Sequence, residues 1–330
     1  MANRELKMRA MSAVEFGGYQ GLKLVDLPRP QASDGKVLVR VTAAGVTPLD
    51  HTILAGHFPL AKAPLVLGNE GAGVIVEGGD SSYPNGTRVM FTGPYGVFEN
   101  GTYSEFVAVK KEHLCAIPDR IDDVAAGTMP VAYLTAYMTL MSAGFAPGKS
   151  VLAPAIGGSI GNAVTQLARA MGAKYAVSST TSHEKAISAK ALGYEQVIDL
   201  SQEKLSDGVM RITEGYGADI IIDAIGGNIL SEALGTLAAG GSLTTLGYAA
   251  DRQSTIDLTH LIWKGTSIKS FLLFSEPLSR WDEAWKAIVP LLKHGQVKPV
   301  VAREFPLELA GEALKHLVDD RPFGRVALKL

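Results

Sequence analysis

The sequence has very little cysteine, and this limits the disulfide and metal chemistry open to it. Cys115 is the one thiol in 330 residues. A single thiol cannot form an internal disulfide or supply a zinc lobe of four cysteines, and it is typical of a reducing compartment. Because Cys115 lies between Leu114 and the strand-like segment AIP, we expect it to be a buried apolar residue.

Long apolar runs and an excess of one charge are also missing. The longest apolar runs have the length of a strand and are broken by glycine or polar residues, so we expect no membrane-spanning segment. The first residues, MANRELKMRAM, carry charges where a secretory signal would be apolar. The 31 basic and 33 acidic residues give a net charge of −2, which disfavours a nucleic-acid-binding surface. We therefore expect a cytoplasmic protein without a nucleic-acid or membrane partner.

The order of the expected elements predicts an α/β protein with two domains. Residues 8–120 contain short strands punctuated by proline and glycine, such as KVLVRVTA at 36–43, which is typical of an irregular β barrel. From residue 122, strands and helices alternate as they do in a doubly wound parallel sheet. The C-terminal segment leaves this rhythm, and we expect it to return to the first domain. We place a β-barrel-like substrate domain at 1–121 and 275–330, and a Rossmann dinucleotide-binding domain at 122–274.

Apolar periodicity predicts the elements of the second half of the chain. Helices are expected at residues 123–141, 163–171, 183–192, 205–213, 230–238, 281–294 and 307–318. Strands are expected from residue 151 and at 173–177, 196–199, 220–224, 241–247, 268–274, near 300, and at 326–330.

One strand–turn–helix–strand unit, residues 151–177, has the context of a nucleotide-binding fingerprint. Its turn reads Ala155-x-x-Gly158-x-x-Gly161, with a further glycine at 157 and alanine where many such folds carry the first glycine. Glycine lets the backbone approach a pyrophosphate, and the first amides of the next helix then point at its charge. We expect the nucleotide phosphates to bind at Ala155, Gly157, Gly158, Ser159, Ile160 and Gly161.

The residues after the second strand bear on which nucleotide binds. A carboxylate there would hold a ribose hydroxyl, whereas a basic residue accommodates a 2′-phosphate. The segment SSTTS at 178–182 precedes His183, Glu184 and Lys185, so no carboxylate occurs before Glu184. We expect NADPH, with Ser179, Thr180 and Lys185 at the adenosine phosphate. Glu184 and Lys185 can also be read simply as the solvated first turn of the next helix.

Five segments in order resemble the medium-chain dehydrogenase/reductase superfamily, and within it the zinc-free quinone oxidoreductases. They are AGVTPLD at 44–50, PLVLGNEGAGV at 64–74, LTAY at 134–137, the glycine turn, and FGRV at 323–326. The resemblance extends over nearly the whole chain. It implies a GroES-like substrate domain followed by a Rossmann domain.

The resemblance also implies that a catalytic zinc is missing. Related zinc alcohol dehydrogenases carry a ligand Cys where Thr47 stands and a ligand His where Asn69 stands. Threonine and asparagine are poor zinc ligands by comparison. The chain departs from the quinone reductases as well, at Thr52 and Phe58, where several relatives have tyrosine, and at Leu200, where many have tyrosine beside the adenosine phosphate.

By resemblance, the cofactor site includes residues beyond the fingerprint. Thr135 would bind the nicotinamide carboxamide, Gly226 and Gly247 would border the dinucleotide, and Phe271, Leu272 and Leu273 would run beside the nicotinamide.

For the acceptor site we expect Thr47, Asp50, His51, Asn69 and Tyr95. Asp50 either orients a neighbour or caps a short helix at 50–55. His51 either donates a proton to the developing oxyanion or is exposed in its loop. Tyr95 either lines the site or packs a turn.

These features predict an NADPH-dependent reductase that passes hydride to a quinone. An alternative is reduction of the C=C bond of an enone or alkenal with the same fold and cofactor, and another is a weakly catalytic NADPH-binding protein. We expect a homodimer, because relatives pair the edges of their nucleotide-domain sheets and the apolar segment 267–274 is the candidate edge.

Overall fold

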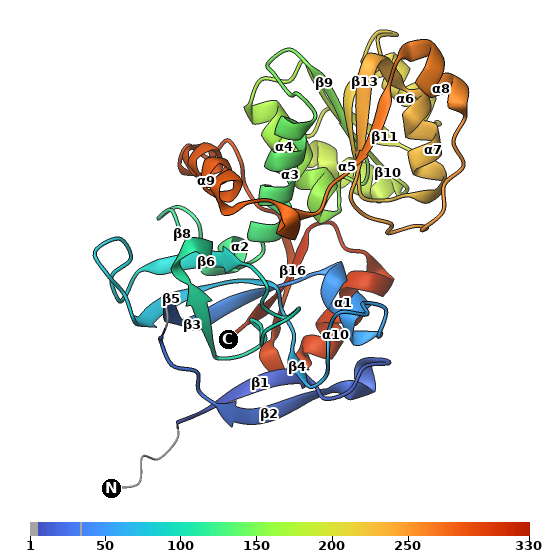
Figure 1. Ribbon diagram of the computed structural model, residues 1–330. Coiled ribbons are helices and arrows are strands. Elements are labelled where there is room, and N and C mark those ends of the chain that lie inside the picture. Colours follow the sequence, from blue (N-terminus) through green and yellow to red (C-terminus); the bar gives the residue numbers. More distant parts are fainter. Residues whose placement is uncertain (1–5, 34) are drawn as a thin grey trace, which may run out of the picture. The chain divides into compact units, whose positions relative to one another are not determined.

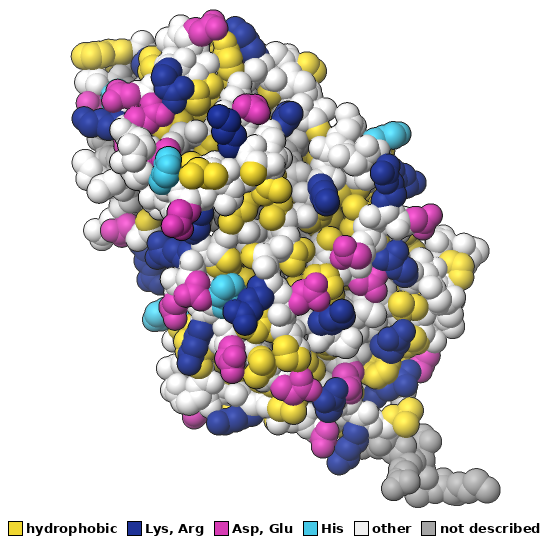
Figure 2. All heavy atoms as spheres, turned by 180° about the vertical axis from the view of Figure 1, so that it is seen from behind, with side chains coloured by type: hydrophobic (Ala, Val, Ile, Leu, Met, Phe, Trp, Pro, Cys, Tyr) yellow, Lys and Arg dark blue, Asp and Glu magenta, His cyan; other side chains and the backbone are white. Residues whose placement is uncertain are grey.

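The chain folds into two units, which Figure 1 shows in the colours of the sequence. The structure is a computed structural model and describes residues 6–33 and 35–330. One unit consists of residues 1–131 and 299–330, and the other of residues 132–298. In the part of the chain that the structure describes, no helix has the length and apolar character needed to cross a membrane. On the face shown in Figure 2, basic and acidic side chains are interspersed.

The first unit is built on β-strands, as the sequence predicts. One sheet has the order β15-β16-β3-β5-β6-β8, with β7 paired to β3, and a smaller sheet has the order β2-β1-β4. The strands are β1 Lys7–Ala13, β2 Leu22–Pro28, β3 Lys36–Val46, β4 Leu65–Val66, β5 Glu70–Glu77, β6 Arg88–Thr92, β7 Phe106–Lys110, β8 Leu114–Ala116, β15 Val301–Pro306 and β16 Arg325–Lys329.

The long strand β3 organises this unit. It pairs antiparallel with β5, β7 and β16, so the C-terminal strand lies beside residues from the start of the chain. Its first half contributes Val37, Val39 and Val41 to one apolar cluster, and its second half contributes Ala44 and Val46 to another. The C-terminal strands β15 and β16 thus belong to the same sheet as β3.

Short helices complete the first unit. They are α1 Pro48–Leu54, α2 Asp123–Gly127 and α10 Ala310–Lys315, and α10 continues as a π-helical turn at His316–Asp320. The single helix expected at residues 307–318 is thus divided: it begins as a 3-10 turn at Leu307–Leu309 before α10. Cys115 is buried, as expected.

The second unit has the six-stranded parallel sheet expected of a Rossmann domain. Its order is β11-β10-β9-β12-β13-β14, so the direction of winding reverses between β9 and β12, where such sheets bind dinucleotides. The strands are β9 Ser150–Ala153, β10 Tyr175–Thr180, β11 Val197–Asp199, β12 Ala218–Asp223, β13 Leu237–Thr245 and β14 Ser267–Ser270. The helices are α3 Pro130–Ser142, α4 Ser159–Ala170, α5 His183–Ala191, α6 Leu205–Ile212, α7 Gly227–Gly235, α8 Leu258–Lys264 and α9 Leu278–Lys293.

Apolar packing places the helices on the two faces of this sheet. Leu205 and Val209 of α6 and Leu230 and Leu234 of α7 join one cluster with the sheet residue Ile221. The helix α4, on the other face, contacts β9 and β10 (Figure 1). The alternation of strand and helix predicted from residue 150 onward is confirmed.

Some predicted boundaries in this half are wrong, and one helix was not predicted. Pro130 begins a new helix, so the helix expected at 123–141 is divided into α2 and α3. The strand β13 starts at Leu237, before the predicted start at residue 241, so α7 ends at Gly235 and not at residue 238. The short helix α8 was not predicted at all. The strand expected at 268–274 ends at Ser270 and is followed by a 3-10 turn at Leu273–Ser275.

The helix α9 groups with the second unit, whereas the sequence suggested a domain limit at residue 274. Arg280 of α9 donates to Ser142 Oγ of α3 at 2.7 Å. The buried face of α9 includes Trp281, Trp285 and Ile288.

Candidate active site

The acceptor residues expected in the first unit are organised by the start of α1. Thr47 is the N-cap of this helix, and Pro48 occupies its first turn, where a missing N–H has no consequence. The Thr47 backbone N–H donates to Asp50 Oδ2 at 2.8 Å, and the Asp50 N–H meets Thr47 Oγ1 at 3.4 Å. These two bonds form a capping box. Asp50 does serve the helix terminus, but from the third helical position, because the helix begins at Pro48 and not at residue 50.

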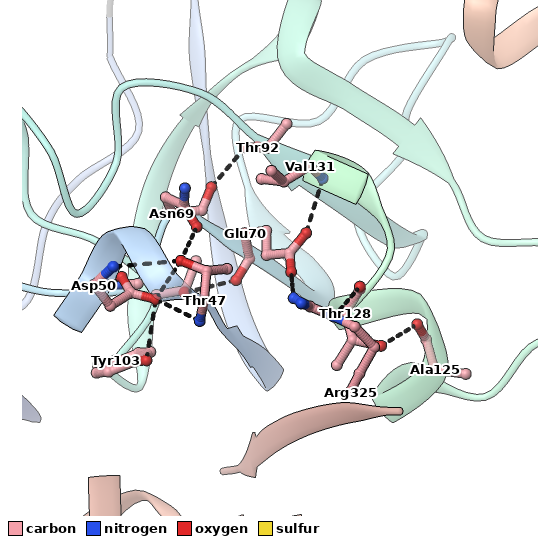
Figure 3. A network of polar contacts seen from close by, with 12 residues as sticks. Thr47, Asp50, Asn69, Glu70, Thr92, Tyr103, Ala125, Thr128, Val131 and Arg325 are labelled. Carbon is pink, nitrogen blue, oxygen red and sulfur yellow. Dashed lines mark hydrogen bonds and ion pairs between the residues drawn. The ribbon is translucent and has the colours of Figure 1, made fainter. Parts of the chain in front are cut away.

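Asp50 is also the centre of a buried hydrogen-bond network (Figure 3). It is fully buried, and its carboxylate accepts from Thr47 Oγ1 at 2.7 Å, from the Gly68 N–H at 3.0 Å and from the Tyr103 hydroxyl at 3.3 Å. Burial raises the pKa of Asp50, and the donated hydrogen bonds oppose that rise. Thr47 Oγ1 lies 3.3 Å from Asn69 Oδ1, so Asn69 joins the same network.

A second buried carboxylate, Glu70, follows Asn69 and is paired with a cation. Arg325 of β16 forms an ion pair with Glu70 and donates to the Thr128 carbonyl at 3.0 Å. Glu70 also accepts the Val131 backbone N–H at 2.8 Å (Figure 3). Burial raises the pKa of Glu70, and the charge of Arg325 opposes this most strongly. Glu70 at the start of β5 is therefore held by Arg325 of β16 and by the Val131 N–H, all within the first unit.

The structure does not bring His51 and Tyr95 into this network. His51 Nδ1 lies 3.2 Å from the Tyr19 hydroxyl. Tyr95 is buried in an apolar cluster, where its hydroxyl accepts the Lys110 N–H and lies 2.9 Å from His113 Nδ1. The surroundings of Tyr95 match the packing alternative considered for it, whereas Thr47, Asp50 and Asn69 lie together.

In the second unit, the turn after β9 has a shape suited to a pyrophosphate. Ala155 adopts a left-handed backbone conformation with φ of 65°, at the position where many such folds have glycine. A Cβ on Gly161 would lie 2.3 Å from the Ala155 carbonyl oxygen, so only glycine lets α4 start so close to the turn. Gly158 is the N-cap of α4 and offers no side chain to the helix terminus.

The first turn of α4 therefore has free donors. Within the described residues, the backbone N–H groups of Ser159, Ile160 and Gly161 meet no acceptor. A helix of 12 residues that starts at the carboxyl end of the central strand presents these donors, with its dipole, to an anion. The residues present thus fit the phosphates of a dinucleotide.

The other predicted cofactor residues also lie in the second unit. Ser179 and Thr180 are buried at the carboxyl end of β10, and Lys185 lies in the first turn of α5. Thr135 is buried in α3, and no partner for its hydroxyl is found in the described part of the chain.

Two glycines bring the loops after β12 and β13 together. Gly226 has a φ of 70° and forms an isolated bridge with Asp251. A Cβ on Gly247 would lie 2.7 Å from the Ala224 carbonyl oxygen. Phe271 follows β14 and donates its N–H to the Thr245 carbonyl, Leu272 is exposed, and Leu273 is buried in the 3-10 turn.

No group of three or more His, Cys, Asp or Glu side chains that could hold a metal ion occurs in residues 6–33 and 35–330.

Sequence comparisons place the chain in a family. Its residues 33–119 match the alcohol dehydrogenase GroES-like domain, and residues 159–293 match the zinc-binding dehydrogenase family. Human quinone oxidoreductase is 30% identical over 327 residues, which cover 96% of each chain. The chain belongs to the medium-chain dehydrogenase/reductase superfamily. This confirms the predicted fold class and family, and it makes the protein an oxidoreductase for which a nicotinamide cofactor is expected.

Solved structures of superfamily members agree with the fold. An NAD-dependent alcohol dehydrogenase is 28% identical with a TM-score of 0.89, covering 98% of this chain and all of its own. A mycobacterial protein in complex with NADPH is 26% identical with a TM-score of 0.86, over the same shares of the two chains. These two relatives differ in their nicotinamide cofactor, which is NAD for the first and NADPH for the second.

Some residues that shape the site could not be found from the sequence. Arg325 stands in the FGRV segment, but nothing in the sequence pairs it with Glu70. Tyr19 contacts His51 and His113 contacts Tyr95, and neither Tyr19 nor His113 belongs to a recognisable motif.

Proposed function

We propose that this superfamily member is an NADPH-dependent reductase that transfers hydride to a quinone without a metal ion. The observation that carries the proposal is the contact between Thr47 and Asn69. These residues stand where zinc-dependent relatives have ligands, and here the Thr47 hydroxyl donates to Asp50 and lies 3.3 Å from Asn69 Oδ1. A hydroxyl and an amide oxygen are poor zinc ligands beside thiolate and imidazole. The likeness to human quinone oxidoreductase supports the same acceptor class.

The acceptor chemistry suits these groups. When bound, the cofactor supplies the hydride, which brings two electrons to the quinone and leaves negative charge on its oxygen. A proton from solvent then completes the hydroquinone. Within the described residues, Asn69 Nδ2 donates no hydrogen bond, so we assign it a bond to the developing oxyanion. Asp50 is a positioning residue in this scheme, because it accepts the hydrogen bond of the Thr47 hydroxyl, and that hydroxyl contacts the Asn69 side chain.

The residues at the carboxyl end of β10 favour NADPH. Ser179, Thr180 and Ser182 offer hydroxyl groups there, and no carboxylate occurs on this strand end before Glu184. Lys185 lies one turn into α5 and supplies a positive charge for a 2′-phosphate. The mycobacterial relative solved with NADPH supports this choice. Thr135, Gly226, Gly247 and the segment 271–273 are proposed to enclose the nicotinamide half.

We further propose that two copies pair through the edge of the parallel sheet. The strand β14 is the last in the sheet and carries unpaired backbone groups on its outer side. Beside β13, α8 turns its apolar residues outward: Ile262 is 72% exposed and Trp263 is 81% exposed. Lys264 instead points inward, where its Nζ donates to the carbonyls of Gly235 and Leu237 at 2.8 Å. A second copy would cover this apolar face.

A substitution at Asn69 tests the proposed acceptor site. Asn69→Ala should lower kcat/KM for a quinone by roughly a hundredfold, because removing one oxyanion donor typically has an effect of that order. The Kd of NADPH should stay unchanged. Asn85→Ala is the matched control, because Asn85 bonds the Gly79 N–H in an exposed turn. Equal quinone turnover in the Asn69 variant and the control would overturn the proposed role.

A further inference from the structure

An ion pair lies at the adenosine end of the parallel sheet, outside every motif of the chain. His183 Nδ1 lies 2.6 Å from Asp199 Oδ2. Asp199 is the last residue of β11, and in the parallel register it stands beside Thr180, the last residue of β10. Both residues therefore lie at the carboxyl edge, where a Rossmann sheet holds the adenosine ribose.

The partners of Asp199 matter, because a carboxylate at this edge could itself hold ribose hydroxyls and select NADH. Its Oδ1 accepts both the Ser201 N–H at 3.0 Å and the Ser201 hydroxyl at 2.6 Å. Its Oδ2 is taken by His183. The bonds from Ser201 and then from His183 lower the pKa of Asp199 and keep it ionised. Each oxygen thus already accepts a hydrogen bond from the protein, which leaves fewer acceptor sites for a ribose hydroxyl.

His183, by contrast, has one ring nitrogen, Nε2, that is available to a ligand. Its side chain is 64% exposed, and no partner of Nε2 is found among the described residues. An ionised carboxylate accepts hydrogen bonds only, so Nδ1 carries the hydrogen of this pair. A ring that carries a hydrogen on both nitrogens offers Nε2 as a second donor. A charge-assisted hydrogen bond from such a donor to a phosphate is among the stronger polar contacts available to a protein.

We propose that His183, held by Asp199, reads the 2′-phosphate and sets the preference for NADPH over NADH. This inference rests on the proposed use of NADPH, and it adds a residue to it. His183 is a specificity-determining residue that touches the cofactor, and Asp199 is its positioning residue. The pair also accounts for an acidic residue beside the site of a dianion, because the hydrogen bond from His183 Nδ1 engages Asp199 Oδ2.

Binding of nucleotides to the purified protein tests the inference without turnover. Calorimetry gives the Kd of NADPH, NADH, 2′,5′-ADP and 5′-AMP for the wild-type chain and for His183→Ala. The variant should bind NADPH and 2′,5′-ADP about tenfold more weakly and bind NADH and 5′-AMP as the wild type does. Lys190→Ala is the matched control, because Lys190 is exposed in the last turn of the same helix and removing it changes the charge of α5 as well.

A double-mutant cycle with Asp199→Asn tests the positioning role. Removing His183 from the wild type leaves the Asp199 carboxylate without its hydrogen-bond partner beside the phosphate. In the Asp199→Asn background, the same change leaves no carboxylate there. His183→Ala should therefore weaken NADPH about tenfold in the wild type and only about threefold in the Asp199→Asn background. Equal losses in both backgrounds would overturn the pairing.

The outcomes separate this inference from the proposed function. A wild type that binds NADPH no better than NADH would overturn both. A wild type that prefers NADPH, with a His183→Ala variant that keeps the full preference, would leave the proposed function standing and overturn the inference. A variant that loses NADPH and NADH equally would do the same, since the effect would then not belong to the 2′-phosphate. Circular dichroism of each variant establishes that the fold is retained.

Discussion

Ala155 allows a prediction whose size can be worked from the backbone. It holds a φ of 65° in the turn between β9 and α4. An L-residue in this left-handed region loses roughly 1–2 kcal/mol relative to the right-handed one, because its Cβ approaches the following carbonyl. Glycine avoids this contact, but its greater backbone freedom lowers the free energy of the unfolded chain by about 0.4–1 kcal/mol. The two effects leave Ala155→Gly more stable than the wild type by about 0.5–1 kcal/mol.

The size of this effect decides the assay. At roughly 2 cal/mol/K per residue, a unit of this length would shift its melting temperature by only about 2 °C. Urea unfolding, followed by circular dichroism, resolves the difference better. Ala170→Gly is the control, since the same change at the last residue of α4, where no left-handed conformation is relieved, should not stabilise the protein. Because glycine can keep the same φ, the Kd of NADPH should remain within about twofold of the wild type.

A destabilised Ala155→Gly variant would refute this reasoning. It would mean that the alanine methyl group contributes packing that outweighs the backbone strain at this position.

Two further predictions concern the first unit and the exposed helix. Arg325→Met should lower the free energy of unfolding, measured in urea, by about 3–5 kcal/mol, because it leaves Glu70 buried without its cation. Adding Glu70→Gln should restore most of that loss. A double variant as unstable as the single one would contradict this. Changing both Ile262 and Trp263 to Glu should convert the proposed dimer to a monomer in sedimentation velocity, because two charges cannot be buried at such an interface. Tyr216→Glu, at another exposed apolar side chain, should leave the assembly unchanged, and a wild type that already sediments as a monomer would refute the dimer.

The regular part of the fold could be predicted because its signals are local. Each strand of the parallel sheet from β9 to β13 is a short apolar run, and glycine or a polar turn separates it from the next helix. The helix α8 escaped prediction for the opposite reason. It has seven residues, and three of its apolar side chains, Leu258, Ile262 and Trp263, are exposed, so its pattern does not mark a buried face. The apolar segment 268–274 was extended as a strand although only Ser267–Ser270 pairs with β13.

The site was predictable where neighbours in sequence make it. Thr47 and Asp50 are three residues apart in the capping box, and the turn from Ala155 to Gly161 is a continuous segment. Contacts between distant residues were not predictable. The Glu70–Arg325 pair spans 255 positions, and its two halves meet only because Arg325 belongs to β16 and β16 pairs with β3. The His183–Asp199 pair depends on the register of two adjacent parallel strands, which no single strand pattern specifies.

A single-turnover measurement of cofactor oxidation, in protein dialysed against a chelator, tests the proposed function most directly. The absorbance of the reduced nicotinamide is followed with p-benzoquinone, phenanthrenequinone and a simple enone, once with NADPH and once with NADH. The account predicts fast oxidation with the quinones and NADPH preferred over NADH. Turnover with the enone alone would contradict the quinone assignment, and tight NADPH binding with no acceptor reduced would contradict the proposal that this chain catalyses hydride transfer to such acceptors.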